Sequence, residues 1–177
     1  MKYIALLRGI NVSGQKRIKM DALTKVFVEL NLNNVQTYLQ SGNVVFQASE
    51  TDLKKLEYQL SSCIEENFGI NVPVLVLSAD TLKSIVENNP FEKSKEGLFI
   101  YITFLYDTPN RIDKQNIESR KSANEEIVFF ERTIYLYCPN GYGRTKLNNN
   151  FLENFLKVKA TTRNWKTVNE LLRIASL

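Results

Sequence analysis

Residues 35–46, which read VQTYLQSGNVVF, decide how the first half of the chain folds. Apolar and polar residues alternate over 35–40, and a second apolar run follows at 44–46. Alternation with a period of two is typical of a β-strand, and a glycine between two such runs supplies the backbone conformation of a tight turn. The stretch therefore predicts a β-hairpin with its turn at Ser41-Gly42-Asn43.

The segments around this hairpin predict a split βαβ order. The apolar run 3–7 predicts a central strand, and apolar residues at helical spacing predict a helix between it and the hairpin. Asp52 opens a second helix, which ends at Gly69. Pro73 gives the next strand, 72–77, the character of an edge strand, and Ser78 is expected to cap a helix that runs toward Pro90.

The second half predicts the same order of elements without detectable sequence identity to the first. We expect a strand at 98–105, a helix from Pro109 to about 121, a hairpin at 127–138 turned at Glu131-Arg132, a helix at 148–156, a short strand at 157–161 and a closing helix at 162–175. The predicted fold is α+β, with two ferredoxin-like alpha-beta plaits of βαββαβ order, each followed by an extra helix. The predicted domains are 1–90 and 91–177.

Composition excludes several kinds of chemistry. The 177 residues include no histidine, which excludes Ser-His-Asp, Cys-His and histidine–metal mechanisms. Cys63 and Cys138 are too few for a disulfide framework. No stretch has the roughly 18 apolar residues of a membrane span, so we expect a cytoplasmic protein with no signal peptide and no membrane partner.

The net charge of +4 comes from the second half of the chain. Residues 1–90 carry 9 basic and 9 acidic side chains, and residues 91–177 carry 14 and 10. A basic region attracts phosphates or nucleic acid, but a dedicated binder of duplex DNA usually carries a stronger charge stripe.

Four segments together identify a family resemblance: ALLRGINVSG at 5–14, YLQSGNVVF at 38–46, GYGRTKL at 141–147 and ATTRNWKTVNEL at 160–171. In this order they resemble the widespread bacterial family known as domain of unknown function 1697, whose pattern reads ALLRGINVGG, QSGNVVF, GxGRSKL and ATxRNWxTVxKL. The chain departs from that pattern mildly, at Ser13 and Thr145. The resemblance implies two alpha-beta plaits and assigns no activity.

The topology of a plait brings these motifs together in pairs. The loop after the first strand lies at the same end of the sheet as the hairpin turn, and the loop at 141–146 lies at the same end as 161–164. Arginine forks suit phosphate or carboxylate, glycines let backbone amides approach a ligand, and we expect Thr162 and Arg163 to start the last helix, where amides favour an anion. The predicted ligand-binding residues are Arg8, Gly9, Asn11, Ser41, Gly42, Asn43, Tyr142, Arg144, Lys146, Thr162, Arg163 and Asn164.

The hypothesis is therefore an anionic small ligand, a nucleotide or phosphorylated metabolite, bound in a cleft formed by both plaits. No acidic residue lies in the four motifs, so no metal held by carboxylates is expected there. Residues 9–16 imitate a phosphate-binding P-loop, but Gln15 stands where that motif needs lysine, and we reject it. The alternatives are an RNA- or protein-binding module without catalysis, and a metal-free enzyme acting on a phosphorylated substrate. The sequence leaves open any cofactor and the oligomeric state.

Overall fold

The computed structural model describes residues 1–12 and 14–177, so the departure from the family pattern at Ser13 lies outside the described residues. The chain divides into two compact units. The first contains residues 1–84 and 170–177, and the second contains residues 85–169. The domain limits predicted from sequence, 1–90 and 91–177, stay a prediction.

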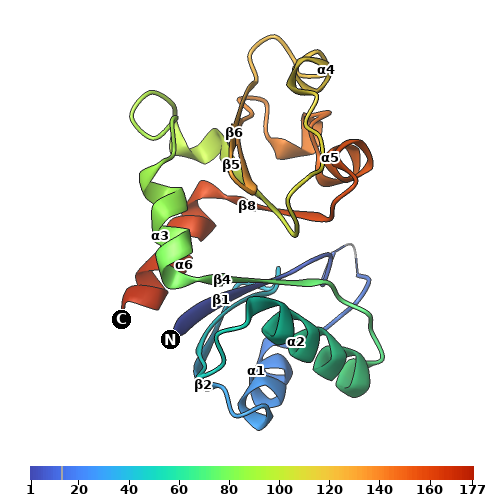
Figure 1. Cartoon of the computed structure of the whole chain (residues 1–177), viewed down its shortest axis with the longest axis vertical. Coiled ribbons are helices and arrows are strands. Elements are labelled where there is room, and N and C mark those ends of the chain that lie inside the picture. The colour runs from blue at the N-terminus through green and yellow to red at the C-terminus, as the bar shows by residue number, and fades with distance from the viewer. Residues whose placement is uncertain (13) are drawn as a thin grey trace. The chain divides into compact units, whose positions relative to one another are not determined.

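The first unit has a four-stranded antiparallel sheet of order β2-β3-β1-β4. Its elements are β1 (Lys2–Leu7), α1 (Met20–Glu29), β2 (Asn33–Tyr38), β3 (Asn43–Gln47), α2 (Leu53–Phe68), β4 (Val74–Ser78) and α3 (Ala79–Glu87). In Figure 1, α1 and α2 lie side by side against one face of this sheet. Strand β1 pairs with both β3 and β4, which makes it the central strand that its apolar run predicts.

Side chains from alternate strand positions form the core of the first unit beneath these helices. Tyr3 and Phe46 face each other across β1 and β3 with ring centroids 5.8 Å apart, and Phe27 of α1 meets Phe46 edge-on at 6.3 Å. Leu56 and Leu60 of α2 complete this buried cluster. Because neighbouring residues of a strand point to opposite faces, the alternation in the sequence fixes which of them reach the helices.

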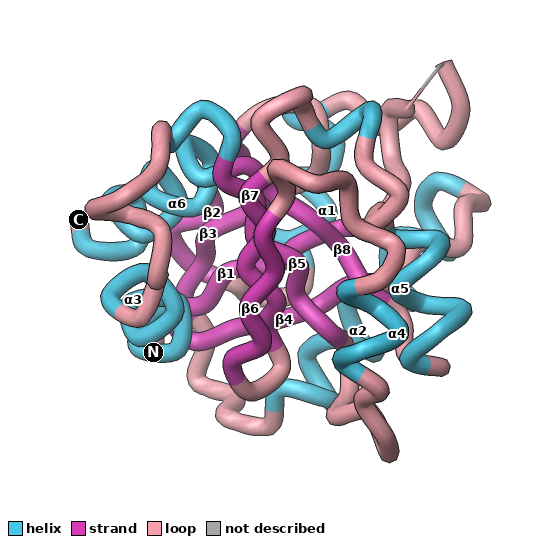
Figure 2. Tube along the Cα trace, turned by 90° about the horizontal axis from the view of Figure 1, so that it is seen from above, coloured by secondary structure: helices cyan, strands magenta, loops and turns pink. Residues whose placement is uncertain are grey.

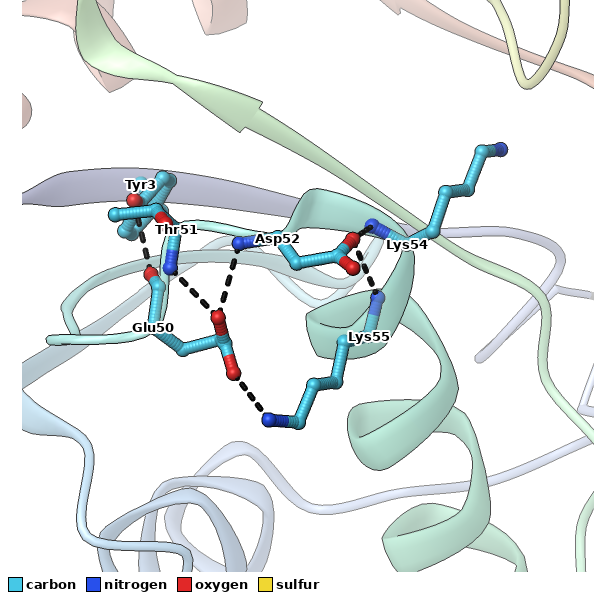
Figure 3. Close-up of polar contacts among 6 residues, drawn as sticks. All are labelled: Tyr3, Glu50, Thr51, Asp52, Lys54 and Lys55. Atoms are coloured by element: carbon cyan, nitrogen blue, oxygen red, sulfur yellow. Dashed lines mark hydrogen bonds and ion pairs between the residues drawn. The ribbon is translucent and has the colours of Figure 1, made fainter.

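A network of polar contacts starts α2 (Figure 3). The Asp52 carboxylate accepts hydrogen bonds from the backbone amides of Lys54 and Lys55, as an N-cap residue should. Glu50 accepts from the amides of Thr51 and Asp52 and forms an ion pair with the Lys55 ammonium at 2.5 Å. These contacts, the bond to Lys55 first, lower the pKa of Glu50 to about 2. At its other end, α2 stops at Gly69 in the left-handed conformation, as predicted.

The second unit repeats this topology, with a sheet of order β6-β7-β5-β8. Its elements are a 3-10 turn (Gly97–Phe99), β5 (Ile100–Leu105), α4 (Lys114–Glu118), β6 (Glu126–Phe130), β7 (Thr133–Tyr137), a 3-10 turn η2 (Tyr142–Arg144), α5 (Asn149–Leu156) and β8 (Ala160–Asn164). Helix α6 (Trp165–Ser176) follows β8, and its residues from 170 onward belong to the first unit. Figure 2 shows α4 and α5 beside the strands of this sheet. Leu152 and Leu156 of α5 pack on Ile134 and Leu136 of β7. Two ferredoxin-like plaits of α+β class, as predicted, therefore make up the chain.

The structure corrects two predicted helix starts. The helix expected from Pro109 begins at Lys114, because Asp113 provides the cap by accepting a hydrogen bond from the amide of Asn116. The closing helix expected from residue 162 begins at Trp165. Thr162 and Arg163 instead extend the strand predicted at 157–161, since they pair with residues of β5, and β8 runs to Asn164.

Within the described chain, none of the helices has the length and apolar content needed to cross a membrane.

Candidate functional site

The loop that follows β1 is fastened by the side chain of Asn11. Its Oδ1 accepts a hydrogen bond from the amide of Ile18 at 2.9 Å, and its Nδ2 donates to the carbonyl of Ile18 at 3.0 Å. The same Nδ2 donates to the carbonyl of Gln40 at 2.8 Å. Asn11 thus closes the loop onto itself and joins it to the β2–β3 turn. Its backbone is left-handed (φ 53°), a conformation that asparagine adopts more readily than most residues.

Gly42 lets the β2–β3 turn approach the same loop closely. It has φ 78°, and its carbonyl accepts a hydrogen bond from the amide of Leu7 at 2.8 Å. A Cβ atom at this position would lie 2.7 Å from Leu7 Cβ and from Ile10 Cδ1. The topological pairing predicted for the first unit is therefore correct, and it depends on a glycine at this position.

The asparagine and serine of this turn also serve its internal structure. Asn43 is fully buried, and its Nδ2 donates to the carbonyl of Tyr38 at 2.8 Å and to Ser41 Oγ at 3.0 Å. These contacts fix the turn between β2 and β3. Of the residues predicted for ligand binding in the first unit, Asn11, Gly42 and Asn43 thus act in the scaffold, and so does the exposed Ser41. Arg8 is half-buried, and Gly9 is exposed.

Two further contacts hold the loop to the segment before β4. The Lys16 ammonium donates to the carbonyl of Asn71 at 2.8 Å, and the amide of Arg8 donates to the carbonyl of Pro73 at 3.0 Å. The loop also folds on itself, with Asn11 N bonded to Lys16 O and Gln15 N to Val12 O. It is therefore fixed from both sides, by the turn and by this segment.

An open cavity of about 480 Å³ lies against this fixed loop. Its lining residues are Asn11, Gly14, Arg17, Ile18, Lys19 and Gln40. The volume falls in the range of small-molecule sites. Arg17 and Lys19 are exposed, and none of the described residues that line the cavity is acidic. We call residues 8–12 and 14–19 the first cationic loop. All of the lining residues except Gln40 belong to it.

In the second unit, a cluster of hydroxyl groups fixes the corresponding loop. The Tyr142 hydroxyl accepts from the amide of Asn149 at 3.1 Å and donates to Thr162 Oγ1 at 3.1 Å. Thr162 Oγ1 donates to Asn149 Oδ1 at 2.7 Å and lies 2.7 Å from Thr103 Oγ1. The Tyr142 ring also packs on Tyr101, with centroids 5.2 Å apart. The two segments meet at Tyr142 and Thr162, and both of these residues belong to the scaffold.

The rest of this loop alternates between inward and outward side chains. Thr145 is buried and accepts from the amide of Leu147 at 3.0 Å. Arg144 and Lys146, on either side of it, are exposed. We call residues 141–147 the second cationic loop. Like the first, it is a fixed backbone that presents exposed cations, three in the first loop (Lys16, Arg17 and Lys19) and two in the second.

Strand β8 separates two residues that the sequence places in one cluster. Thr162 faces Tyr142, whereas Arg163 is on the opposite face of the sheet, because successive strand residues alternate. Its guanidinium donates to Thr161 Oγ1 at 2.9 Å and to the carbonyl of Thr162 at 3.0 Å. Although part of the side chain is accessible, burial of the guanidinium lowers the pKa of Arg163 to about 10, so it is charged at neutral pH.

Asn164 has a capping role. Its Oδ1 accepts a hydrogen bond from the amide of Thr167 at 2.8 Å, and α6 begins at the next residue. The sequence predicts that free helix amides at Thr162 and Arg163 favour an anion. The structure differs, because the helix starts only after Asn164.

The residues predicted for ligand binding do not include Arg17 and Lys19, because the only motif considered for this region is the P-loop, which it does not match. A signal was present nevertheless. Residues 8–20 contain four cations, Arg8, Lys16, Arg17 and Lys19, and no acidic residue. Among the residues that the structure describes, no group of three or more Cys, Asp or Glu side chains is arranged to hold a metal ion.

Comparison with known proteins agrees with this fold. A family model described as "Protein of unknown function (DUF1697)" matches residues 1–135. A solved structure, that of the conserved bacterial protein SP0830 from Streptococcus pneumoniae, is similar over 98% of both chains, with a TM-score of 0.76 and 23% identity. No curated protein matches the chain.

Proposed function

We propose a function for this chain, which belongs to the DUF1697 family of proteins of unknown function, from the geometry of its loops. The protein binds an anionic small ligand, a nucleotide or phosphorylated metabolite, in the cytoplasm. The observation that carries this proposal is the cavity against the first cationic loop, which Arg17 and Lys19 line without an acidic neighbour. A fixed loop loses little conformational entropy on binding, so its cations are preorganised for an anion.

The scaffold role of the motif residues supports this proposal. Asn11 and Gly42 hold the first loop, and Tyr142 and Thr162 hold the second. Each loop presents exposed cations next to residues that fix its backbone, an arrangement expected of a binding loop on a rigid sheet. A single cleft formed by both plaits stays a prediction, and it is tested by combining variants of the two loops.

A thermal-shift screen tests the proposal. The wild-type protein is screened against nucleotides, sugar phosphates, polyphosphate and short RNA, beside Arg17→Ala/Lys19→Ala, Arg144→Ala/Lys146→Ala and the quadruple variant. A ligand present at a hundred times its dissociation constant stabilises the folded state by about 2.7 kcal/mol, which is readily detected. We expect stabilisation by a phosphorylated compound that is lost in the first double variant. Loss in both double variants would support one shared cleft, and no stabilisation by any anion would refute the proposed function.

A protein partner is a second candidate, because two apolar side chains are exposed in the same region. Val12 in the first cationic loop is 58% exposed, and Leu39 before the β2–β3 turn is 52% exposed with a left-handed backbone (φ 60°). Exposed apolar residues next to cations suit a partner with an acidic and apolar surface. In that case Val12→Ser and Leu39→Ser would weaken complex formation, whereas they would leave the response to small phosphates unchanged.

A further inference from the structure

The arginine in the cavity of the first unit is held in one orientation by a glycine. Arg17 Nε donates to the carbonyl of Gly14 at 3.1 Å. A Cβ atom on Gly14 would lie 3.2 Å from Arg17 Nη2, so the guanidinium packs directly over that glycine. Among the residues that the structure describes, the terminal Nη groups of Arg17 have no hydrogen-bond partner. Two parallel N–H groups are therefore presented as a preformed fork.

The charge around this fork amounts to more than one cation. Lys19 lines the same cavity and is exposed, and Lys16 is three residues before it. The nearest acidic side chain along the chain is Asp21, in the first turn of α1. The β2–β3 turn (39–42) and segment 70–73, which pack on the loop, contribute no charged side chain. An anion with two negative charges is thus matched better than one with a single charge.

We propose that this cavity recognises the dianionic phosphate of a phosphate monoester, with Arg17 as the recognition fork, Gly14 as the residue that positions it and Lys19 as the second cation. The proposal rests on the proposed function and deepens it by naming the ligand class. An Arg fork binds two phosphate oxygens at once, which a lysine cannot do. The phosphodiester of a nucleic acid has one charge per phosphate and leaves the second cation unmatched.

The absence of histidine makes the charge of the ligand directly testable. The second pKa of a phosphate monoester is about 6, and no histidine of this chain titrates in that range. Between pH 7.5 and 5.0 the dianionic fraction of the phosphate falls to about a tenth. Affinity for a monoester should therefore fall about tenfold over this range, and affinity for a diester should stay constant.

Isothermal titration calorimetry with four probes tests the proposal: adenosine monophosphate, the diester adenylyl-adenosine, adenosine and inorganic phosphate. We expect the monophosphate to bind at least about tenfold more tightly than the diester, and adenosine not to bind. Arg17→Ala and Arg17→Lys should each weaken monophosphate binding about tenfold or more, because the second keeps the charge but loses the fork. Arg120→Ala, which removes an exposed arginine of the second unit, is the matched control and should bind as wild type does.

Gly14→Ala provides a second variant without changing any charge, since its Cβ would lie 3.2 Å from Arg17 Nη2 and shift the guanidinium by a few tenths of an ångström, and alanine at φ 77° would also strain the loop backbone. It should weaken monophosphate binding, and it decides the matter if Arg17→Ala melts earlier than wild type. Equal affinity for monoester and diester, no pH dependence, or wild-type binding by both Arg17 variants would overturn the inference while leaving the proposed function intact. Binding of none of the phosphates would overturn the inference, and the wider thermal-shift screen then decides the proposed function.

Discussion

The two cationic loops belong to the same kind of plait, yet different chemistry fixes them. In the first unit a single amide side chain, that of Asn11, makes three hydrogen bonds to backbone groups, and Gly42 allows the close contact. In the second unit, hydroxyl groups of Tyr142 and Thr162 do the same work through side-chain contacts. The fold thus sets where a loop is held, whereas the residues that hold it differ between the units.

This difference predicts which changes each loop tolerates. In the first loop, the hydrogen bonds to backbone groups depend on one side chain, the amide of Asn11. In the second loop, the hydroxyl cluster distributes its contacts over several residues. The first loop should therefore be the more sensitive of the two, and the following variants test that order.

The largest effect is expected from Gly42→Ala. Its Cβ would lie 2.7 Å from Leu7 Cβ and Ile10 Cδ1, in a left-handed backbone. Strain and overpacking together should reduce the free energy of unfolding by about 3 kcal/mol. The control is Gly9→Ala, which has φ 71° but no atom within 4 Å of the new Cβ, and should cost only about 1 kcal/mol. Urea unfolding measures both, and equal costs would show that steric contact does not decide the turn.

Asn11→Ala should follow, at about 2 kcal/mol. It removes the hydrogen bonds to the amide and carbonyl of Ile18 and to the carbonyl of Gln40. Asn11→Asp is the sharper variant, because it keeps the acceptor for the amide but places a carboxylate against two carbonyls. Urea unfolding should find Asn11→Asp no more stable than Asn11→Ala. Recovery of wild-type stability in Asn11→Asp would show that the two donated bonds do not hold the loop.

Tyr142→Phe should cost less, about 1 kcal/mol. The change removes one hydroxyl that accepts from the amide of Asn149 and donates to Thr162, but it keeps the ring on Tyr101. Thr162→Val, which removes the hydroxyl at the centre of the cluster, is the comparison. If Tyr142→Phe destabilised the protein more than Asn11→Ala does, the second loop would be the more dependent on one residue, contrary to our account.

The smallest effect is a pH dependence at the start of α2, in the first unit only. Hydrogen bonds and the ion pair with Lys55 lower the pKa of Glu50 to about 2, from about 4.5 in the unfolded chain. Between these pH values the unfolded state binds more protons, so the contribution is complete above about pH 4.5 and is lost as the pH falls toward 2. The stability difference between wild type and Glu50→Gln, from unfolding at several pH values, should shrink over this window. A constant difference would contradict the ion pair.

The sequence predicted the fold well because its strands and helices follow simple periodicities. The hairpin at 35–46, the cap Asp52 and the stop at Gly69 were all identified from local patterns. The start of α6 was not, because Thr162 and Arg163 pair with a strand distant in sequence, and that pairing competes with helix formation. Propensity within a short window cannot show such a tertiary contact.

The candidate site was predicted less well, for a related reason. The motif residues Asn11, Asn43 and Tyr142 are polar, and polar residues in a motif predict contacts to a ligand. Their partners turned out to be backbone groups and hydroxyls of the chain itself. Sequence order could place the loops together through topology, but it could not show which polar atoms the scaffold already uses. Arg17 and Lys19 line the cavity although they lie outside the residues first assigned to the site.

The most direct test of the central claim is an NMR titration of the ¹⁵N-labelled protein with adenosine monophosphate at pH 7.5. Our account predicts that the largest amide shifts fall on Asn11, Gly14, Arg17, Lys19 and Gln40, which line the cavity of the first unit. It also predicts that Arg17→Lys needs about ten times as much ligand to reach half of these shifts. Saturating ligand that leaves these amides unshifted would contradict the claim that the first cationic loop binds an anion.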